Sequence, residues 1–245
     1  QKDPISVHVD TPLDEVAQII EKYDLVAIPV LDSIGRLVGQ ITVDDVMDEV
    51  REQSERDYQL ASGLSQDVET DDNVFRQTTA RLPWLIIGML GGIGNSMILG
   101  NFDATFAAHP EMALYIPLIG GTGGNVGTQS SALIVQGLAN SSLDSKNTLK
   151  QVAKEAVVAL INATIISLLV YTYNFIRFGA MATVTYSVSI SLFAVVMFAS
   201  IFGTLVPMTL ERLKIDPAIA TGPFIAITND IIGMMLYMGI TVLLS

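Results

Sequence analysis

The sequence predicts a mainly α, polytopic membrane protein with five transmembrane helices, preceded by a small α/β unit and a connecting helix. Two observations carry this prediction. Half of the 245 residues are hydrophobic, and apolar stretches long enough to cross a bilayer recur after residue 80. Residues 1–80 hold 18 of the 25 acidic and 6 of the 13 basic residues, so the net charge of −12 lies entirely there. An acidic soluble part argues against nucleic acid as a partner and favours cations.

Residues 1–50 show the element order of a small α/β unit. A helix is expected over 11–24, and strands over 26–31 and 37–41 flank a turn at 32–35. A further helix follows Thr42, which has the spacing of a capping box with Asp45. Because the chain begins at Gln1 and not at methionine, we expect it to be a piece of a longer protein.

Residues 51–80 are polar and are predicted to form a cytosolic connecting helix. This segment ends in an acidic run made of Asp67, Glu69, Asp71 and Asp72. A solvated linker is the usual form of such a run. The alternative is a helix that binds cations between subunits.

Residues 81–245 are predicted to form the membrane domain, with apolar segments at about 82–102, 112–139, 155–176, 181–210 and 217–244. If the N-terminus is cytoplasmic, only Arg177 lies outside. The basic residues on the cytoplasmic side are then Arg76, Arg81, Lys146, Lys150, Lys154, Arg212 and Lys214. The positive-inside rule therefore predicts a multi-pass protein of the inner or plasma membrane, with a cytoplasmic N-terminus and an external C-terminus.

Asp230 is the only acidic residue near the middle of a predicted span, since Glu155 falls at the start of the third one. A carboxylate at bilayer depth is costly and normally faces a partner, a cavity or an ion. Pro223, seven residues earlier, is expected to leave the carbonyl of Ile219 without its helical partner. This combination indicates a site for a hard cation. The alternative is an interhelical hydrogen bond, for instance from Asn162 or Thr164.

The predicted second span contains five glycines within residues 120–127, and we expect it to be interrupted there. Glycines allow helices to approach closely, and they also expose backbone. Asn125, Thr128 and Gln129 lie at the same depth, which favours a segment that lines water. Both interpretations, close packing and a water-lined wall, stay open. A phosphate-binding loop is excluded because no Gly-Lys-Ser/Thr ending is present.

Two stretches of sequence are similar to known families. The phrase Ile-Pro-Val-Leu-Asp-Ser-Ile-Gly-Arg-Leu-Val-Gly-Gln-Ile-Thr-Val-Asp-Asp, residues 28–45, resembles a CBS motif. CBS motifs normally pack in pairs, so residues 1–50 are expected to be the second of a pair. In CBS modules a Thr-x-x-Asp such as Thr42 and Asp45 often contacts the ribose of an adenine nucleotide, which would make ATP a ligand. An ordinary capping box is the simpler interpretation.

The chain as a whole resembles the MgtE family of magnesium transporters. The similarity rests on the CBS motif, the acidic connecting helix, Arg-Leu-Pro-Trp-Leu at 81–85, Gly-Gly-Asn-Val-Gly-Thr-Gln at 123–129, and Asp-Pro-Ala…Gly-Pro-Phe…Asp at 216–230. It implies a homodimer with five spans per subunit and a pore on the two-fold axis, lined by the second and fifth spans. It also implies a channel or transporter that imports Mg²⁺ down the membrane potential, and not an enzyme.

The resemblance also implies two sets of metal ligands. In the pore they are Asp230, Gly222, Ala226, Gly124, Asn125 and Thr128. In the cytosolic part, Asp45, Asp48 and Asp57 would bind regulatory Mg²⁺ between subunits and close the pore through the "plug" helix of residues 51–80. Gln53 and Arg56 stand where the family often has glutamates, and Thr128 and Gly222 where some relatives have asparagine. These departures bear on Mg²⁺-dependent closure and on ion selection.

Three other functions have to be compared with the same residues. A CBS-regulated membrane sensor or scaffold would bind cations without conducting them. An intramembrane hydrolase would need a second mid-span acid, which the chain itself lacks and which only a dimer could supply. An anion transporter is opposed by Asp230 and by the absence of basic residues in the middle of the predicted spans.

Overall fold

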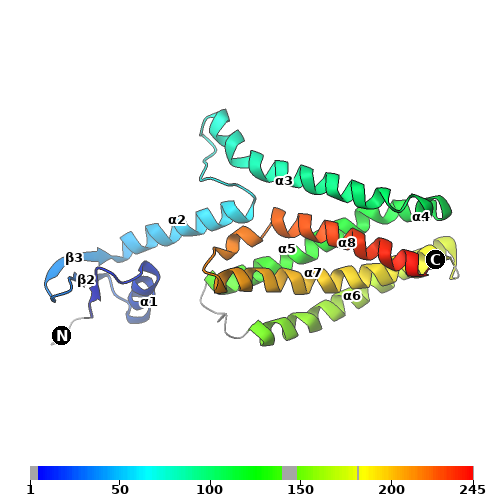
Figure 1. Cartoon of the computed structure of the whole chain (residues 1–245). Helices are drawn as coiled ribbons and strands as arrows, with labels where there is room; N and C mark the ends of the chain where they lie inside the picture. The colour runs from blue at the N-terminus through cyan, green and yellow to red at the C-terminus, as the bar shows by residue number, and fades with distance from the viewer. Residues whose placement is uncertain (1–4, 140–147, 181, 245) are drawn as a thin grey trace. The chain divides into compact units, whose positions relative to one another are not determined.

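The computed structural model describes residues 5–139, 148–180 and 182–244. Lys146, used above for the topology, lies outside them. The chain divides into two compact units, Gln1–Tyr58 and Gln59–Ser245. Figure 1 shows both and labels most of their helices and strands. Each unit is described by itself.

The first unit is a three-stranded sheet packed on helices. Its elements are β1 (Val7–His8), α1 (Leu13–Tyr23), β2 (Ala27–Leu31), β3 (Leu37–Thr42) and the start of α2 (Val43–Ala61). Strand β2 is central, because it pairs with β1 in parallel and with β3 in antiparallel orientation. Val16 and Ile20 on one face of α1 pack with Ile28 and Val46 in the core. The predicted helix and two strands are confirmed, whereas the sequence analysis did not anticipate β1.

The second unit consists of helices, which Figure 1 shows lying largely alongside one another. They are α3 (Val74–Gly100), α4 (Asp103–Ala108), η1 (Pro110–Tyr115), α5 (Ile116–Ala139), α6 (Thr148–Phe178), α7 (Thr183–Arg212), η3 (Pro217–Ala220) and α8 (Pro223–Leu244). Helix α7 contacts α5, α6 and α8. Its side chains Val188, Leu192 and Val195 are buried in the main apolar core. Helix α3 packs on α8.

Four helices of the described chain are long and apolar enough to cross a membrane: α3, α6, α7 and α8. Helix α5, which contains the predicted second span, is not among them. Its 24 residues correspond to a length of about 36 Å, but its glycines and polar side chains lower its hydropathy. A polytopic, mostly helical protein is therefore confirmed, and α5 as the second of five spans stays a prediction.

Three local predictions differ from the structure. Helix α5 is continuous through its glycines, so the expected interruption is wrong. Helix α8 begins at Pro223 and not at residue 217, because proline suits the first turn of a helix and Gly222 adopts a positive φ of 52° before it. Pro223 therefore does not break a helix interior. Residues 51–80 are not one helix: α2 ends at Ala61, and Asn73 caps α3 by accepting from the N–H of Arg76 at 2.8 Å.

Candidate functional site

Asp230 lies in α8, two turns after Pro223. Its side chain is half-buried, and it forms no hydrogen bond or ion pair with any residue in the described part of the chain. The alternative of a bond from Asn162 or Thr164 is wrong, since the Thr164 hydroxyl donates to the carbonyl of Leu160 instead. Asp230 is thus an uncompensated carboxylate within an apolar helix, the situation that favours a bound cation.

A cavity of about 360 Å³ opens beside Asp230 between α5, α8 and α3. The predicted residues that line it are Gly124, Asn125, Thr128, Ala226 and Asp230. The α5 glycines let the backbone approach the carboxylate: a Cβ added to Gly120 or Gly124 would lie 3.4 or 3.5 Å from Oδ1 of Asp230. The α5 glycines therefore allow α5 and α8 to pack closely, and they also form one wall of the cavity.

Gly222 is the one predicted pore residue outside this cavity. Its carbonyl accepts the N–H of Ala226 at 3.0 Å in the first turn of α8. A Cβ at Gly222 would lie 2.1 Å from the carbonyl oxygen of Ala61. The glycine is therefore required by its positive φ and by this close approach of two backbones.

Asn95 of α3 also lines the cavity, and the sequence analysis missed it. Its Oδ1 is buried and has no hydrogen-bond partner among the described residues. The available signal was the same as for Asp230, a polar side chain inside an apolar segment. What the sequence could not show is that α3 packs on α8 and so brings Asn95 to the same cavity.

The oxygens around the cavity belong to one carboxylate, the amides of Asn95 and Asn125, and the hydroxyl of Thr128. Such ligands suit hard cations, and Mg²⁺ in particular keeps several of its waters when a single carboxylate binds it. A water needs about 10–15 Å³ of such space, so the cavity has room for a cation with part of its hydration shell.

The cytosolic candidates lie on α2 or directly before it. Thr42 and Asp45 form a capping box: the Thr42 N–H donates to Asp45 Oδ2 at 3.0 Å, and the Asp45 N–H donates to Thr42 Oγ1 at 3.3 Å. The Thr42 hydroxyl also donates to Asp45 Oδ2, and this bond is the main reason why the pKa of Asp45 is lowered. Within the described residues, Asp48 and Asp57 join no group of three or more metal-binding side chains.

Basic side chains neutralise part of the acidic surface of α2. Arg56 pairs with Glu49 at 3.1 Å and with Glu52 at 3.4 Å, and Arg51 pairs with Glu55 at 3.0 Å. Arg56 thus pairs with two acids of the same helix.

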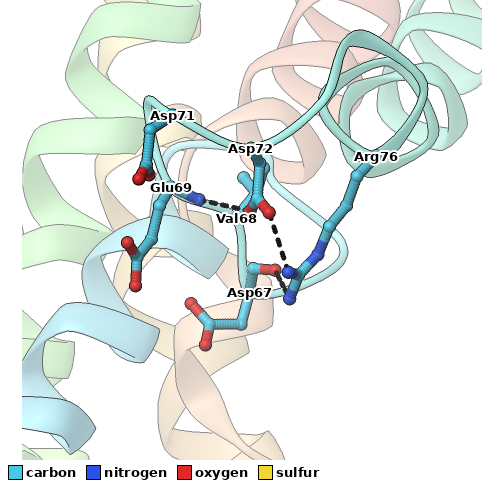
Figure 2. A pocket seen from close by; sticks show the side chains of 6 residues that line it. All are labelled: Asp67, Val68, Glu69, Asp71, Asp72 and Arg76. Atoms are coloured by element: carbon cyan, nitrogen blue, oxygen red, sulfur yellow. Dashed lines mark hydrogen bonds and ion pairs between the residues drawn. The ribbon is translucent and has the colours of Figure 1, made fainter.

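The acidic run of residues 67–72 lies in a folded loop and not in a helix. Asp72 accepts from the N–H of Glu69 at 2.9 Å and pairs with Arg76 at 2.8 Å. Arg76 also donates to the carbonyl of Asp67 at 3.1 Å, and Figure 2 shows the carboxylates of Glu69 and Asp71 away from Arg76. The helical interpretation of this run is wrong, because these local bonds close a turn instead.

Comparisons with known proteins agree with this geometry. Residues 116–240, which contain α5 and most of α8, match the MgtE family, described as divalent cation transporters, and residues 1–52 match the CBS domain. The chain is 34% identical to a magnesium transporter MgtE of Bacillus subtilis over 93% of its length. It is 33% identical to the protein of that name from Thermus thermophilus over 98%, and 31% identical to that from Enterococcus faecalis over 96%.

The alignments cover 50%, 53% and 52% of these three proteins, so the chain spans about half the length of the relatives it matches. The family match nevertheless extends over half of this chain and includes α5 and most of α8, two of the three helices that line the cavity. The chain belongs to the MgtE family of divalent cation transporters, which are not enzymes.

Proposed function

We propose that this chain forms half of a dimeric, Mg²⁺-selective channel or transporter, and that Mg²⁺ passes between α5 and α8 at Asp230. The observation that carries the proposal is the half-buried carboxylate of Asp230, without a partner in the described chain, in a cavity walled by glycines and neutral oxygens. Gly124, Asn125, Thr128 and Ala226 would contact the hydrated ion, and Gly222 would position the start of α8.

A dimer with its pore on the two-fold axis would bring two copies of Asp230 together. Two facing carboxylates repel one another unless a cation or proton neutralises them. One divalent cation would balance the two negative charges of the facing carboxylates. Because a divalent cation entering the cell gains about 4.6 kcal/mol per 100 mV of inside-negative potential, import needs no further energy source.

The α/β unit has the exposed apolar surface expected of an unpaired CBS motif. Val26, Leu37 and Val38 are 77%, 68% and 56% exposed. We infer that residues 1–50 pack against another CBS motif of the same protein or of its dimer partner. Asp45, Asp48 and Asp57 would bind intracellular Mg²⁺ across subunits and close the pore through residues 51–80, and ATP at Thr42 and Asp45 is a secondary proposal.

Mg²⁺ uptake into proteoliposomes under an inside-negative potential tests the pore assignment. The wild-type chain is compared with Asp230→Asn, which keeps the size of the side chain and removes its charge. Asp103→Asn is the matched control, since Asp103 is exposed in α4 and does not line the cavity. We expect uptake to be lost in Asp230→Asn and retained in the control, with both variants still folded.

Equal uptake by wild type and Asp230→Asn would remove Asp230 from the mechanism. A chain that binds Mg²⁺ but shows no uptake, even when Mg²⁺ on the cytosolic side is depleted, would instead support the cation sensor without conduction.

A further inference from the structure

Glu155 of α6 is a second buried acid in the membrane domain, and the proposed pore does not use it. Its side chain is 9% exposed. The hydroxyl of Ser130 in α5 donates to its Oε1 at 2.7 Å, and the hydroxyl of Ser200 in α7 donates to the same oxygen. The two serines are 5% and 2% exposed and lie 3.0 Å apart, Oγ to Oγ. One carboxylate and two hydroxyls from three helices therefore converge in the interior.

A cavity of about 430 Å³ adjoins this cluster. Besides the three residues, its polar lining consists of Gln129, Gln136, Gln151, Lys154 and Asn162. It shares no lining residue with the cavity at Asp230. Side-chain amides supply carbonyl oxygens, so the second cavity also has the ligand chemistry of a hard cation.

Within the described residues, Glu155 forms no ion pair, although Lys154 lines the same cavity. Both serine bonds go to Oε1, and Oε2 has no partner within 5–139, 148–180 and 182–244. Lys154 is exposed, and it forms no ion pair with Glu155. Neutral hydroxyls satisfy hydrogen bonding but leave a net charge that is costly inside a membrane protein. A bound cation would remove this cost.

The number of acids indicates the charge of that cation. Glu155 is the only carboxylate in the lining, and the described chain has no group of three or more acidic or histidine side chains that could hold a metal. Apart from the exposed Lys154, the other polar groups of the lining are neutral, so the one carboxylate matches a single positive charge. We propose that Glu155, Ser130 and Ser200 form a binding site for an alkali-metal cation such as Na⁺, between α5, α6 and α7 and separate from the Asp230 cavity.

Binding of radioactive sodium to the purified chain in detergent tests the site directly. We expect saturable binding to wild type and its loss in Glu155→Gln, which keeps an acceptor for both serines but removes the charge. Glu211→Gln is the matched control, because Glu211 is exposed at the end of α7 and lines neither cavity. No saturable binding to wild type, or equal binding to Glu155→Gln, would overturn the proposal and leave the cluster as an interhelical clamp only.

Two further measurements do not depend on the folding of Glu155→Gln. Competition on the wild-type chain should show displacement of sodium by other alkali cations and not by equimolar Mg²⁺, and displacement by Mg²⁺ would overturn the monovalent assignment. Gln151→Leu, which removes one cavity amide and leaves Glu155 in place, should weaken sodium binding, whereas unchanged binding would contradict a site in this cavity.

Asp230→Asn separates this site from the proposed pore. We expect it to lose Mg²⁺ uptake and to bind sodium as the wild type does. Loss of sodium binding in this variant would place the ion at Asp230 and refute a second site. Retained Mg²⁺ uptake would contradict the pore assignment and leave the alkali-cation site standing.

Discussion

At the scale of single residues, unsatisfied polar atoms mark the candidate pore. Asp230 and the Oδ1 of Asn95 have no partner in the described chain, and both face one cavity. Buried polar atoms are usually hydrogen-bonded. Several other buried side-chain atoms also lack a partner among the described residues, but of these residues only Asn95 lines the cavity at the half-buried Asp230. The packing around Asp230 and Asn95 provides neither side chain with a hydrogen-bond partner in the described chain.

Replacing Asn95 should therefore impair transport more than stability. We expect Asn95→Leu to reduce Mg²⁺ uptake by about two- to tenfold, the effect of one lost neutral hydrogen bond to the hydrated ion. The measurement is initial uptake rate in proteoliposomes at several Mg²⁺ concentrations. Ser96→Leu is the control, because Ser96 is exposed on the same helix and does not line the cavity. Equal rates in both variants would exclude Asn95 from the ion path.

In the α/β unit, Asp32 closes the turn between β2 and β3. Its Oδ1 accepts the N–H of Arg36 at 2.8 Å and that of Ile34 at 3.0 Å, and its Oδ2 accepts Nε of Arg36 at 2.9 Å. The backbone bond from Arg36 is the largest cause of the lowered pKa of Asp32, and these bonds outweigh the opposing desolvation.

This lowered pKa predicts a loss of order in acid. The stabilisation is complete above the ordinary pKa of 3.8 and is lost as the pH falls through the lower folded-state pKa. In the wild type, the protection of residues 27–42 from hydrogen exchange should fall in that pH range relative to neutral pH. In Asp32→Asn, this protection should depend less on pH. Asp10→Asn, at an exposed position, should behave as the wild type does. A pH response unchanged in Asp32→Asn would argue against this role.

At the scale of elements, the α5 backbone closely approaches the α7 backbone and a side chain of α8. A Cβ at Gly203 of α7 would lie 2.4 Å from the carbonyl oxygen of Gly127 in α5. A Cβ at Gly127 would lie 1.8 Å from Nδ2 of Asn229 in α8. One face of α5 thus packs tightly while another face lines the cavity at Asp230, and the packing sets the distance between the glycine wall and the carboxylate.

Gly203→Ala should push α5 and α7 apart. Because the contact is with backbone and cannot be relieved by a side-chain rotation, we expect a destabilisation of about 1–3 kcal/mol, read as a lower midpoint of thermal unfolding in detergent. Gly239→Ala in α8 is the matched control: a Cβ there meets nothing within 4 Å. A midpoint as high in Gly203→Ala as in Gly239→Ala would mean that the helices separate at no cost.

At the scale of the whole molecule, the charge on α2 bears on the proposed closure of the pore by cytosolic Mg²⁺. Arg56 pairs with Glu49 and Glu52, so these acids are partly neutralised within the helix. In the proposed gating, Mg²⁺ must bind acids of α2 between subunits. We therefore infer that closure in this chain needs more Mg²⁺ than in relatives with a glutamate at this position.

Under the proposed gating, Arg56→Glu should make uptake more sensitive to inhibition by cytosolic Mg²⁺. We expect the Mg²⁺ concentration that half-inhibits uptake to fall, because the substitution removes one positive charge, adds a negative one and frees two acids. Arg36→Glu provides the control for charge alone, since Arg36 lies in the β2–β3 turn and pairs only with Asp32 among the described residues. An identical shift in both variants would indicate a general electrostatic effect and not a site on α2.

The sequence by itself determined the membrane class and the α/β unit, and it singled out Asp230 as an acid near the middle of a predicted span. Each depends on local patterns: long apolar runs, strand and turn signals, and a charge at bilayer depth, which is costly unless a partner, a cavity or an ion compensates it. The glycine segment and Asp230 could be joined only through the family resemblance, because no local pattern states which helices touch.

The composition of the candidate site and the burial of Glu155 were decided only by the tertiary structure. It brought Asn95 of α3 to the Asp230 cavity and placed Gly222 outside that cavity. It also buried Glu155 between Ser130 and Ser200, although its sequence position had suggested only the start of a span. These outcomes depend on how helices distant in sequence pack, and packing is decided by the shapes of both partners, such as Gly127 against Gly203, which no single segment contains.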